Sequence, residues 1–325
     1  MSLLVVCEHD RGVLSAASLE ALTFGRPLAT AAGLDLAAVV IGAGAESVVE
    51  GLGAYGAATV HVASHPILVD FGPEAWGETV AQLVRSTGVS AVLACGTERG
   101  NEVLAQVAAR LDQPLVANCR AVEPSADGWS ITRVQWGGSL LEDARLTADV
   151  QLITVAHHVV EAEPAETSAA GEVSAFAPEL DESLARTVVA DRVVLTQGIT
   201  LSTAPVVVGG GRGVGSAEAF APLEELAGEL GGVVGCSRAV TNNGWRPHRD
   251  QVGQTGTRIA PDIYIASGIS GAIQHWVGAM AAKNILAINT DAEANMVTRA
   301  GHAVIGDLHQ VIPAITEEVR RRRGS

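Results

Sequence analysis

The sequence is poor in aromatic residues and in positive charge. Phe, Trp and Tyr make up only 3% of the 325 residues, whereas glycine occurs 36 times. This composition is typical of α/β folds, in which tight glycine turns connect layers of small aliphatic side chains. Lys and Arg number 21 against 36 Asp and Glu, so the formal net charge is −15. Such an acidic chain is unsuited to general binding of nucleic acid or anionic membranes.

Cysteines and long apolar runs are also scarce. The four cysteines are too scattered for a disulfide framework or a CxxC metal site, and they fit a reducing cytosol. No apolar run is long enough to span a bilayer. The first ten residues lack the basic segment and long apolar stretch of a signal peptide. We therefore expect a cytoplasmic protein without membrane insertion. The cysteines are Cys7, Cys95, Cys119 and Cys236.

The length and the hydrophobic pattern predict two α/β domains. A chain of 325 residues is long enough for two separate cores. Short apolar segments alternate with longer amphipathic ones, which indicates βαβ units and mostly parallel sheets. We place the domains at residues 1–195 and 196–325. In the first domain, strands are expected at 3–7, 36–41, 59–63 and 91–95, and helices at 15–31, 76–86 and 101–111.

After residue 129, the first domain no longer shows the alternation of predicted strands and helices. Strands expected at 131–138 and 149–155, with little helix between them, predict an antiparallel edge to the sheet. Residues 161–178 are rich in Glu, Ala, Pro and Ser and are expected to form a loose segment. Residues 187–194 again have the pattern of a strand.

In the second domain, polar residues follow the predicted strands. Three of these strands end at Gly209, Ser267 and Asn289. Ligands of open parallel sheets bind outside the carboxyl ends of the strands, so a ligand site is expected at this edge. The predicted strands are 205–208, 263–266, 285–288 and 303–305, and the predicted helices are 216–230, 270–280 and 311–321.

A glycine loop at residues 209–215 leads from a strand to a helix, with Ser216 as its expected N-cap. Exposed N–H groups and the helix dipole would favour a phosphate there. The spacing matches neither GxGxxG nor GxxxxGK[ST], so the chain lacks the dinucleotide and triphosphatase fingerprints. A plain βα turn explains this string equally well.

Five further features have both a binding and a structural interpretation. Arg238 beside a small-residue turn suits a phosphate or delocalised anion, or it is simply solvated. Residues 251–256, QVGQTG, form a binding loop or a surface turn. His275, in the second turn of a helix capped by Ser270, lies near the positive end of the helix dipole, or it is an ordinary core residue. Asn289 and Asp307 contact a ligand or cap their own turns.

Taken together and in order, these segments resemble the FAD domain of the electron transfer flavoprotein alpha subunit. Residues 251–256 and 268–275 carry most of the resemblance. Weaker matches at residues 8–10, 19–22 and 108–111 extend it to the first half. Further matches in the second half are residues 237–239, 287–289 and 306–308.

The resemblance implies two Rossmann-like domains, of which the second binds FAD, in a heterodimer with a beta subunit. Such proteins carry electrons from dehydrogenases, including acyl-CoA dehydrogenases of fatty acid beta-oxidation, to a quinone oxidoreductase or another acceptor. They require no catalytic residue and no metal. The alternative within the family is the alpha subunit of an electron-bifurcating, NADH-linked flavoprotein. A nicotinamide-dependent enzyme would need a fingerprint that the chain does not show, and a module without flavin would not keep all the contacts.

Carried over position by position, the resemblance implies sixteen FAD contacts. Arg238 would lie against the isoalloxazine, Thr255 would reach toward N5, and His275 would face the N1–C2=O edge. Arg212 and its glycine loop would cradle phosphate or ribose, and Asp307 would lie toward the adenosine. The contacts are Arg212, Ser237, Arg238, Val252, Gly253, Gln254, Thr255, Ser270, Gly271, Ala272, Ile273, Gln274, His275, Asn289, Asp307 and Leu308.

Two segments depart from the family pattern. Arg246, His248 and Arg249 make the segment before the QVGQTG loop unusually basic, and they could alter the flavin potential or the choice of partner. His157 and His158 stand where many members have Arg-Pro. The donor and the acceptor therefore stay open.

Overall fold

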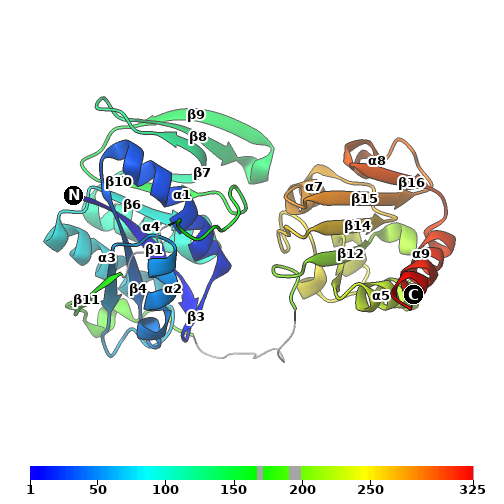
Figure 1. Ribbon diagram of the computed structural model, residues 1–325, viewed down its shortest axis with the longest axis horizontal. Coiled ribbons are helices and arrows are strands. Elements are labelled where there is room, and N and C mark those ends of the chain that lie inside the picture. The colour runs from blue at the N-terminus through cyan, green and yellow to red at the C-terminus, as the bar shows by residue number, and fades with distance from the viewer. Residues whose placement is uncertain (167–170, 190–198, 325) are drawn as a thin grey trace. The chain divides into compact units, whose positions relative to one another are not determined.

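The computed structural model describes residues 1–166, 171–189 and 199–324, which form two compact α/β units (Figure 1). The first unit includes residues 1–136 and 140–189, and the second includes residues 199–324. The expected boundary at 195/196 lies outside the described residues. Each unit consists of a mostly parallel sheet with helices on both faces, which confirms the predicted fold class.

A nine-stranded sheet forms the middle layer of the first unit, in the order β11-β5-β4-β1-β6-β10-β7-β8-β9. Its central strand β1 (Ser2–Cys7) pairs in parallel with β4 (Asp35–Ile41) and β6 (Ala91–Cys95). A small hairpin, β2 (His9–Asp10) and β3 (Val13–Leu14), follows β1. The remaining strands are β5 (Thr59–Ala63), β7 (Leu115–Glu123), β8 (Trp129–Gln135), β9 (Leu140–Leu146), β10 (Gln151–Val155) and β11 (Glu172–Phe176).

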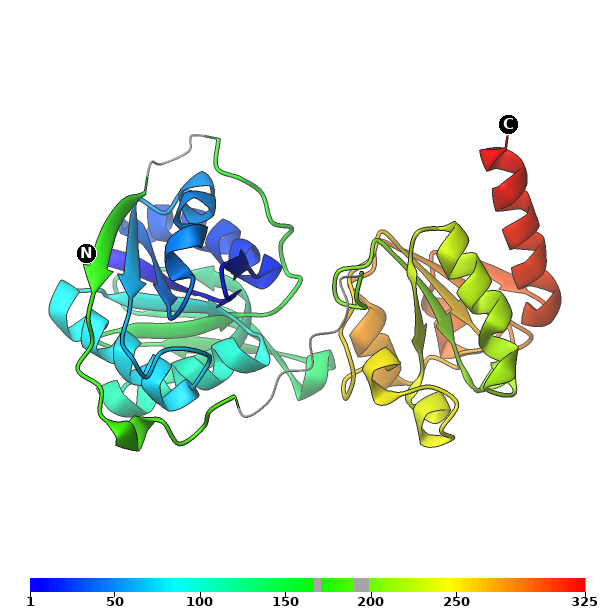
Figure 2. The same cartoon turned by 90° about the horizontal axis from the view of Figure 1, so that it is seen from below.

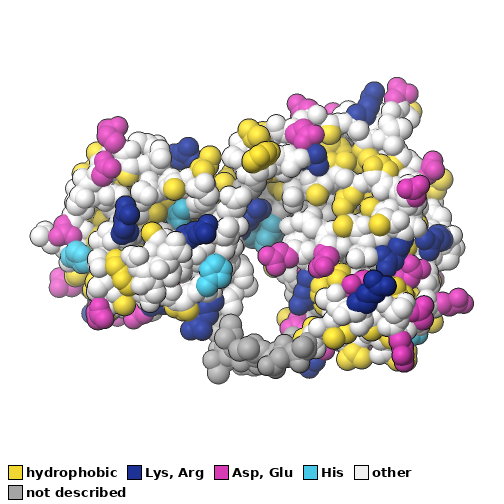
Figure 3. All heavy atoms as spheres, turned by 180° about the vertical axis from the view of Figure 1, so that it is seen from behind, with side chains coloured by type: hydrophobic (Ala, Val, Ile, Leu, Met, Phe, Trp, Pro, Cys, Tyr) yellow, Lys and Arg dark blue, Asp and Glu magenta, His cyan; other side chains and the backbone are white. Residues whose placement is uncertain are grey.

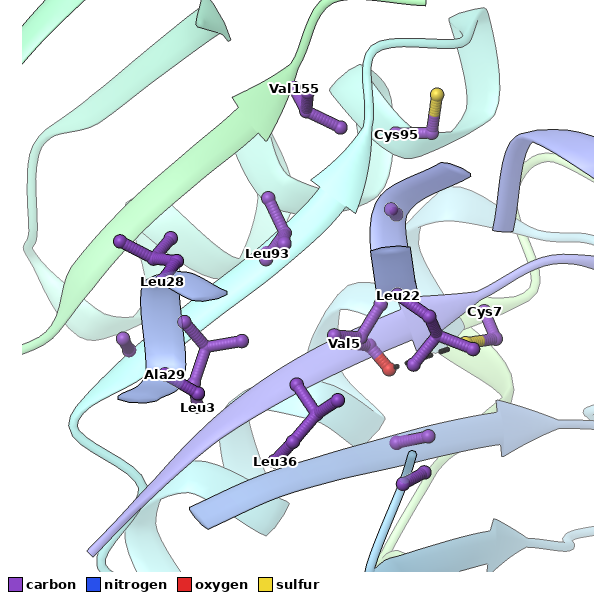
Figure 4. Close-up of a cluster of buried hydrophobic side chains, with 14 of the residues drawn as sticks. Leu3, Val5, Cys7, Leu22, Leu28, Ala29, Leu36, Leu93, Cys95 and Val155 are labelled. Atoms are coloured by element: carbon purple, nitrogen blue, oxygen red, sulfur yellow. Dashed lines mark hydrogen bonds between the residues drawn. The ribbon is translucent and has the colours of Figure 1, made fainter. Parts of the chain in front are cut away.

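Helices cover both faces of this sheet, as Figure 2 shows. Alternate side chains of β1 pack into the two cores on opposite faces of the sheet. Leu3, Val5 and Cys7 pack with α1 and α2, and Figure 4 shows them in the same cluster as Leu22 and Leu28 of α1. Leu4 and Val6 pack with α3 and α4. A strand buried on both faces has a continuous apolar sequence, as β1 does. The helices are α1 (Ala16–Ala32), α2 (Val49–Ala54), α3 (Pro73–Thr87) and α4 (Glu98–Leu111).

The structure corrects the expectations for residues 129–189. β7, β8 and β9 form the antiparallel edge, but β10 runs parallel and lies between β6 and β7. Its apolar side chains are buried on both faces, which is the requirement of an interior strand. The segment expected to be loose contains β11, whose alternating sequence suits an edge strand beside β5. Residues 187–189 form no strand, and the rest of that expected strand lies outside the described residues.

The second unit has a five-stranded parallel sheet in the order β13-β12-β14-β15-β16. One face packs Tyr264 and Met296 into a core, and the other packs Phe220 and Ile312 into another. The strands are β12 (Val206–Gly210), β13 (Val233–Cys236), β14 (Ile263–Ser267), β15 (Asn284–Asn289) and β16 (His302–Ile305). The helices are α5 (Ala221–Glu229), α6 (Arg238–Asn242), α7 (Ile273–Ala279), α8 (Asn295–Arg299) and α9 (Leu308–Arg323).

Three helix starts differ from those expected. α5 begins at Ala221 after a 3₁₀ turn, because Pro222 lacks an N–H and favours the first turn of a helix. The Ser216 hydroxyl still accepts a hydrogen bond from the Ala219 N–H. α7 begins at Ile273, so His275 lies in its first turn rather than its second. α9 begins at Leu308, where the Asp307 side chain accepts from the His309 N–H.

The acidic residues in excess lie in the first unit. Residues 1–189 contain 24 Asp and Glu against 9 Lys and Arg, whereas residues 199–324 contain 11 of each. Asp and Glu side chains are scattered over the face shown in Figure 3 rather than gathered in one patch. Among the described residues, no helix combines the length and the apolar character needed to cross a membrane.

The four cysteines should be unreactive in the folded protein. Burial raises the pKa of every thiol, to about 12 for Cys119 and Cys236 and further for Cys7 and Cys95. Because the thiolate is the reactive form, a disulfide reagent at pH 8 should modify none of them within minutes. The same reagent in guanidinium chloride should modify all four. Fast modification of one cysteine in the native protein would contradict its burial.

Candidate functional site

A pocket of about 540 Å³ opens at the carboxyl edge of the second sheet. It lies where β12, β13, β14 and β15 end, which is the edge that sequence analysis predicts for a ligand. Its volume is within the range of cofactor sites. The lining residues are Arg212, Gly213, Ser237, Arg238, Ala239, Gly268, Ile269, Ser270, Gly271, Ala272, Gln274, His275, Asn289, Asp291 and Ala294.

Nine of the sixteen expected contacts line this pocket. They are Arg212, Ser237, Arg238, Ser270, Gly271, Ala272, Gln274, His275 and Asn289. The other seven are placed next to it or in the core around it. Val252 and Leu308 are buried apolar core residues, and Ile273 is half exposed on α7. Gly253, Gln254 and Thr255 belong to the loop that packs against the start of α7, and Asp307 caps α9.

Two glycines of the loop at residues 209–215 bring it into contact with the turn after β14, and the phosphate cradle that we expected there stays a prediction. The Gly211 N–H donates to the Ser267 carbonyl at 2.8 Å, and the Gly213 N–H donates to the Gly268 carbonyl at 3.1 Å. A Cβ atom at Gly211 would clash with the Gly268 carbonyl, and one at Gly213 would lie 2.8 Å from the Gly268 Cα. These glycines therefore allow two backbone turns to touch, and these two N–H groups are already used within the protein.

Two arginines give the pocket its positive charge. Arg212 follows β12, and Arg238 is the first residue of α6. Both side chains are exposed, and within the described part of the chain neither forms an ion pair with a carboxylate. Guanidinium groups without an acidic partner suit a phosphate or another delocalised anion.

His275 is the most buried polar residue of the pocket wall. Its Nε2 lies 2.8 Å from the Tyr264 hydroxyl, and its Nδ1 is buried without a hydrogen-bond partner in the structure. Burial lowers the pKa of His275 to about 4, and burial also raises the pKa of Tyr264. The imidazole is therefore neutral at physiological pH, so it can act on a ligand through hydrogen bonding or contact but not through charge.

The QVGQTG loop supports the His275 helix from outside the pocket. The Gln254 N–H donates to the Gln274 carbonyl at 2.7 Å. Gln251 is buried, its amide nitrogen donates to the Thr255 hydroxyl, and its oxygen accepts from Thr241. This network explains the amides and hydroxyls that an apolar core would not need.

Asn289 and Asp307 show the structural roles that we weighed for them. The Asn289 side chain donates to the Ile269 carbonyl at 3.1 Å and accepts from the Asp291 N–H. It thus joins the turns after β14 and β15 while lining the pocket. Asp307 caps its helix and does not line the pocket.

Sequence reasoning missed Tyr264, and it identified Ser267 only as the end of a strand. Tyr264 lies inside an apolar strand and is fully buried, so the sequence pattern did not identify its hydroxyl as part of a polar site. Ser267 ends the same strand and is fully buried with its hydroxyl unpartnered. Its place at the end of a strand was a usable signal.

The basic segment before the QVGQTG loop is largely neutralised. Arg246 pairs with Glu224 and with Asp250, and it lies over the Phe220 ring. Arg249 lies 3.8 Å from the other Asp250 oxygen. None of these residues lines the pocket.

Comparison with known proteins adds independent information. The electron transfer flavoprotein domain model matches residues 3–181, and the electron transfer flavoprotein FAD-binding domain model matches residues 200–280. The chain is 38% identical over 323 residues to an electron transfer flavoprotein subunit alpha of Mycobacterium leprae, covering 99% of both chains. It is 33% identical to the corresponding subunit of Thermoanaerobacterium thermosaccharolyticum, covering 98% of this chain and 97% of the relative. It is also 35% identical to Protein FixB of Azorhizobium caulinodans, covering 98% and 88%.

The pocket lined by Arg212, Arg238 and His275 lies in the unit that the FAD-binding model matches. The two domain models together span most of the sequence, and the relatives match it almost end to end. The chain therefore belongs to the electron transfer flavoprotein alpha-subunit family, whose members bind FAD and carry electrons.

Proposed function

We propose that the chain pairs with a beta subunit and carries electrons from dehydrogenases, such as acyl-CoA dehydrogenases, to a quinone oxidoreductase or another acceptor. In this proposal residues 1–195 contact the partner subunit and residues 196–325 hold FAD. The observation that carries it is the meeting of nine residues from distant segments around one pocket in the FAD-binding unit.

The pocket residues suit FAD on three counts. Arg212 and Arg238 form no ion pair with a carboxylate among the described residues, so they suit a phosphate group and the flavin ring, respectively. The orphaned His275 Nδ1 needs a hydrogen-bond partner that a ligand can provide. The pocket volume of about 540 Å³ is within the range of cofactor sites.

In the proposed mechanism, FAD accepts and releases electrons, and the chain binds it and tunes it. Arg212, Ser237 and Ser270 would hold its polar groups. Arg238 would place a positive charge near the ring, and neutral His275 would donate a hydrogen bond from Nδ1. Val252, Gly253, Gln254, Thr255, Ile273, Asp307 and Leu308 would act mainly by supporting this wall, with Thr255 and Ile273 free to reach the cofactor from its rim.

The spectrum of the chain tests this proposal directly. The chain should be produced with the beta subunit encoded beside it and then mixed with an acyl-CoA dehydrogenase and its substrate. We expect a flavin spectrum that is bleached only when dehydrogenase and substrate are both present. A folded but colourless complex that cannot take up added FAD would refute the cofactor assignment. A yellow complex that acyl-CoA dehydrogenase does not reduce would refute only the donor.

Replacement of Arg238 by alanine should lower the reduction potential of the bound flavin. A unit charge at about 4 Å is worth roughly 1–4 kcal/mol, and the exposure of Arg238 favours the lower end. One kcal/mol corresponds to about 40 mV for one electron. Spectroelectrochemical titration measures the shift, and exposed Arg258→Ala serves as the control. Equal potentials in Arg238→Ala and the parent would remove Arg238 from this role.

Replacement of Tyr264 by phenylalanine should weaken FAD binding while leaving the fold intact. The variant removes the hydroxyl that lies 2.8 Å from His275 Nε2 and so releases the imidazole from one orientation. A net hydrogen bond is worth about 0.5–1.5 kcal/mol, so we expect a roughly 2- to 10-fold rise in the FAD dissociation constant. Tyr55→Phe, at the only other tyrosine, is the matched control. The same affinity in both variants would show that Tyr264 is only a packing residue.

The second unit should lose stability on acidification. The pKa of His275 is about 4 when folded, below about 6.5 for an unfolded chain. Between these values the unfolded state binds more protons, so the free energy of unfolding falls as the pH drops from 6.5 toward 4. Imidazole ¹⁵N spectra should show His275 neutral throughout pH 5–8. A His275 resonance that titrates within that range would contradict this assignment.

A further inference from the structure

Glu20 and two adjacent histidines form a compact cluster in the first unit, apart from the residues that line the flavin pocket. The Glu20 Oε1 atom lies 3.2 Å from His158 Nδ1 and 3.6 Å from His157 Nε2. These three atoms all lie within 4.8 Å of one another. The side chains of Glu20, His158 and His157 are 10%, 14% and 23% exposed, so the cluster is largely buried but open to solvent on one side.

The backbone holds this cluster in place before any ligand arrives. Glu20 is on α1, and the histidines follow the end of β10. The His158 N–H donates to Glu20 Oε2 at 2.8 Å, which leaves Oε1 for the imidazoles. His158 has a φ of 62°, a conformation that is uncommon without glycine.

The chain beyond the histidines is tied to the same face of α1. Thr23 and Arg26 follow Glu20 at intervals of three residues, and both donate to the Glu163 carbonyl. The Glu163 N–H donates back to the Thr23 hydroxyl at 3.1 Å. The loop that carries the histidines is therefore fastened at both ends.

We propose that Glu20, His157 and His158 bind a divalent transition-metal ion, with solvent completing the coordination. Two imidazoles and a carboxylate with an open fourth position are a known ligand set for Zn²⁺. Imidazole also suits Ni²⁺ and Cu²⁺, whereas Mg²⁺ and Ca²⁺ prefer oxygen ligands alone. Both histidines face one carboxylate oxygen while the backbone N–H of His158 contacts the other, so the three ligand atoms lie within reach of a single ion.

Binding would move the histidine rings. The rings are stacked, with centroids 3.7 Å apart and planes 20° apart. A metal ion lies near the plane of each imidazole that binds it, so the stacked rings must tilt apart when both become ligands. A pair of histidines that served only as hydrogen-bonding partners of Glu20 would keep its stacking.

Calorimetric titration of the chelator-treated, flavin-bound full chain with Zn²⁺ tests this site. We expect one saturable Zn²⁺ per chain, and loss of affinity of at least about 10-fold in His157→Gln and in Glu20→Gln. Exposed His302→Gln, on β16 of the second unit, is the matched control and should bind as the parent does. Imidazole ¹⁵N resonances of His157 and His158 should shift together as the ion is added.

Two results would overturn the proposal. One is the absence of saturable Zn²⁺ and Ni²⁺ binding, which would leave a carboxylate–histidine hydrogen-bond cluster. The other is unchanged affinity in both ligand variants, which would place the ion elsewhere. If Glu20→Gln fails to fold, the more exposed His157→Gln decides alone, with circular dichroism and flavin content as checks on its fold.

Discussion

The close approach of two backbone turns shapes the flavin unit. The turn after β12 donates hydrogen bonds from Gly211 and Gly213 to the carbonyls that end β14. Any larger side chain at Gly211 would force these turns apart. Arg212 follows β12, whereas Ser270 and His275 follow the neighbouring strand β14. Because the turns after these two strands touch, all three residues line the same pocket. The glycines thus act on the cofactor site through the positions of their neighbours.

Arg238 and His275 can act on a ligand in different ways, because one is exposed and the other is buried. Arg238 is exposed and keeps its charge, so it can act on a ligand over several ångströms, although solvent and salt weaken its effect. His275 is buried beside Tyr264 and is neutral, so it acts only through the direction of its N–H. The sequence pattern grouped these two residues as similar sources of positive potential. Their exposure separates them, and exposure is a property of the fold.

The sequence predicted the parallel sheets, most strands and the edge that carries the pocket, because strand period and turn chemistry are local. It failed where tertiary pairing decides the outcome. The apolar run of β10 is compatible with an edge or an interior, and only its insertion between β6 and β7 shows which. The contact of the glycine loop with Ser267 and Gly268 could not be predicted, because these hydrogen-bond partners are more than fifty residues away. Tyr264 was missed for the same reason, since its partner His275 lies on another element.

The two units thus use histidine in opposite ways. In the flavin unit, burial keeps the His275 imidazole neutral, and its Nε2 lies against the Tyr264 hydroxyl. In the first unit, two imidazoles share one carboxylate oxygen at the edge of solvent, where a cation can replace a proton. Because both imidazoles face the same Glu20 oxygen, a metal ion bound there would replace the hydrogen bond between Glu20 and His158 with coordination bonds. The contact between α1 and the loop after β10 would then depend on the ion.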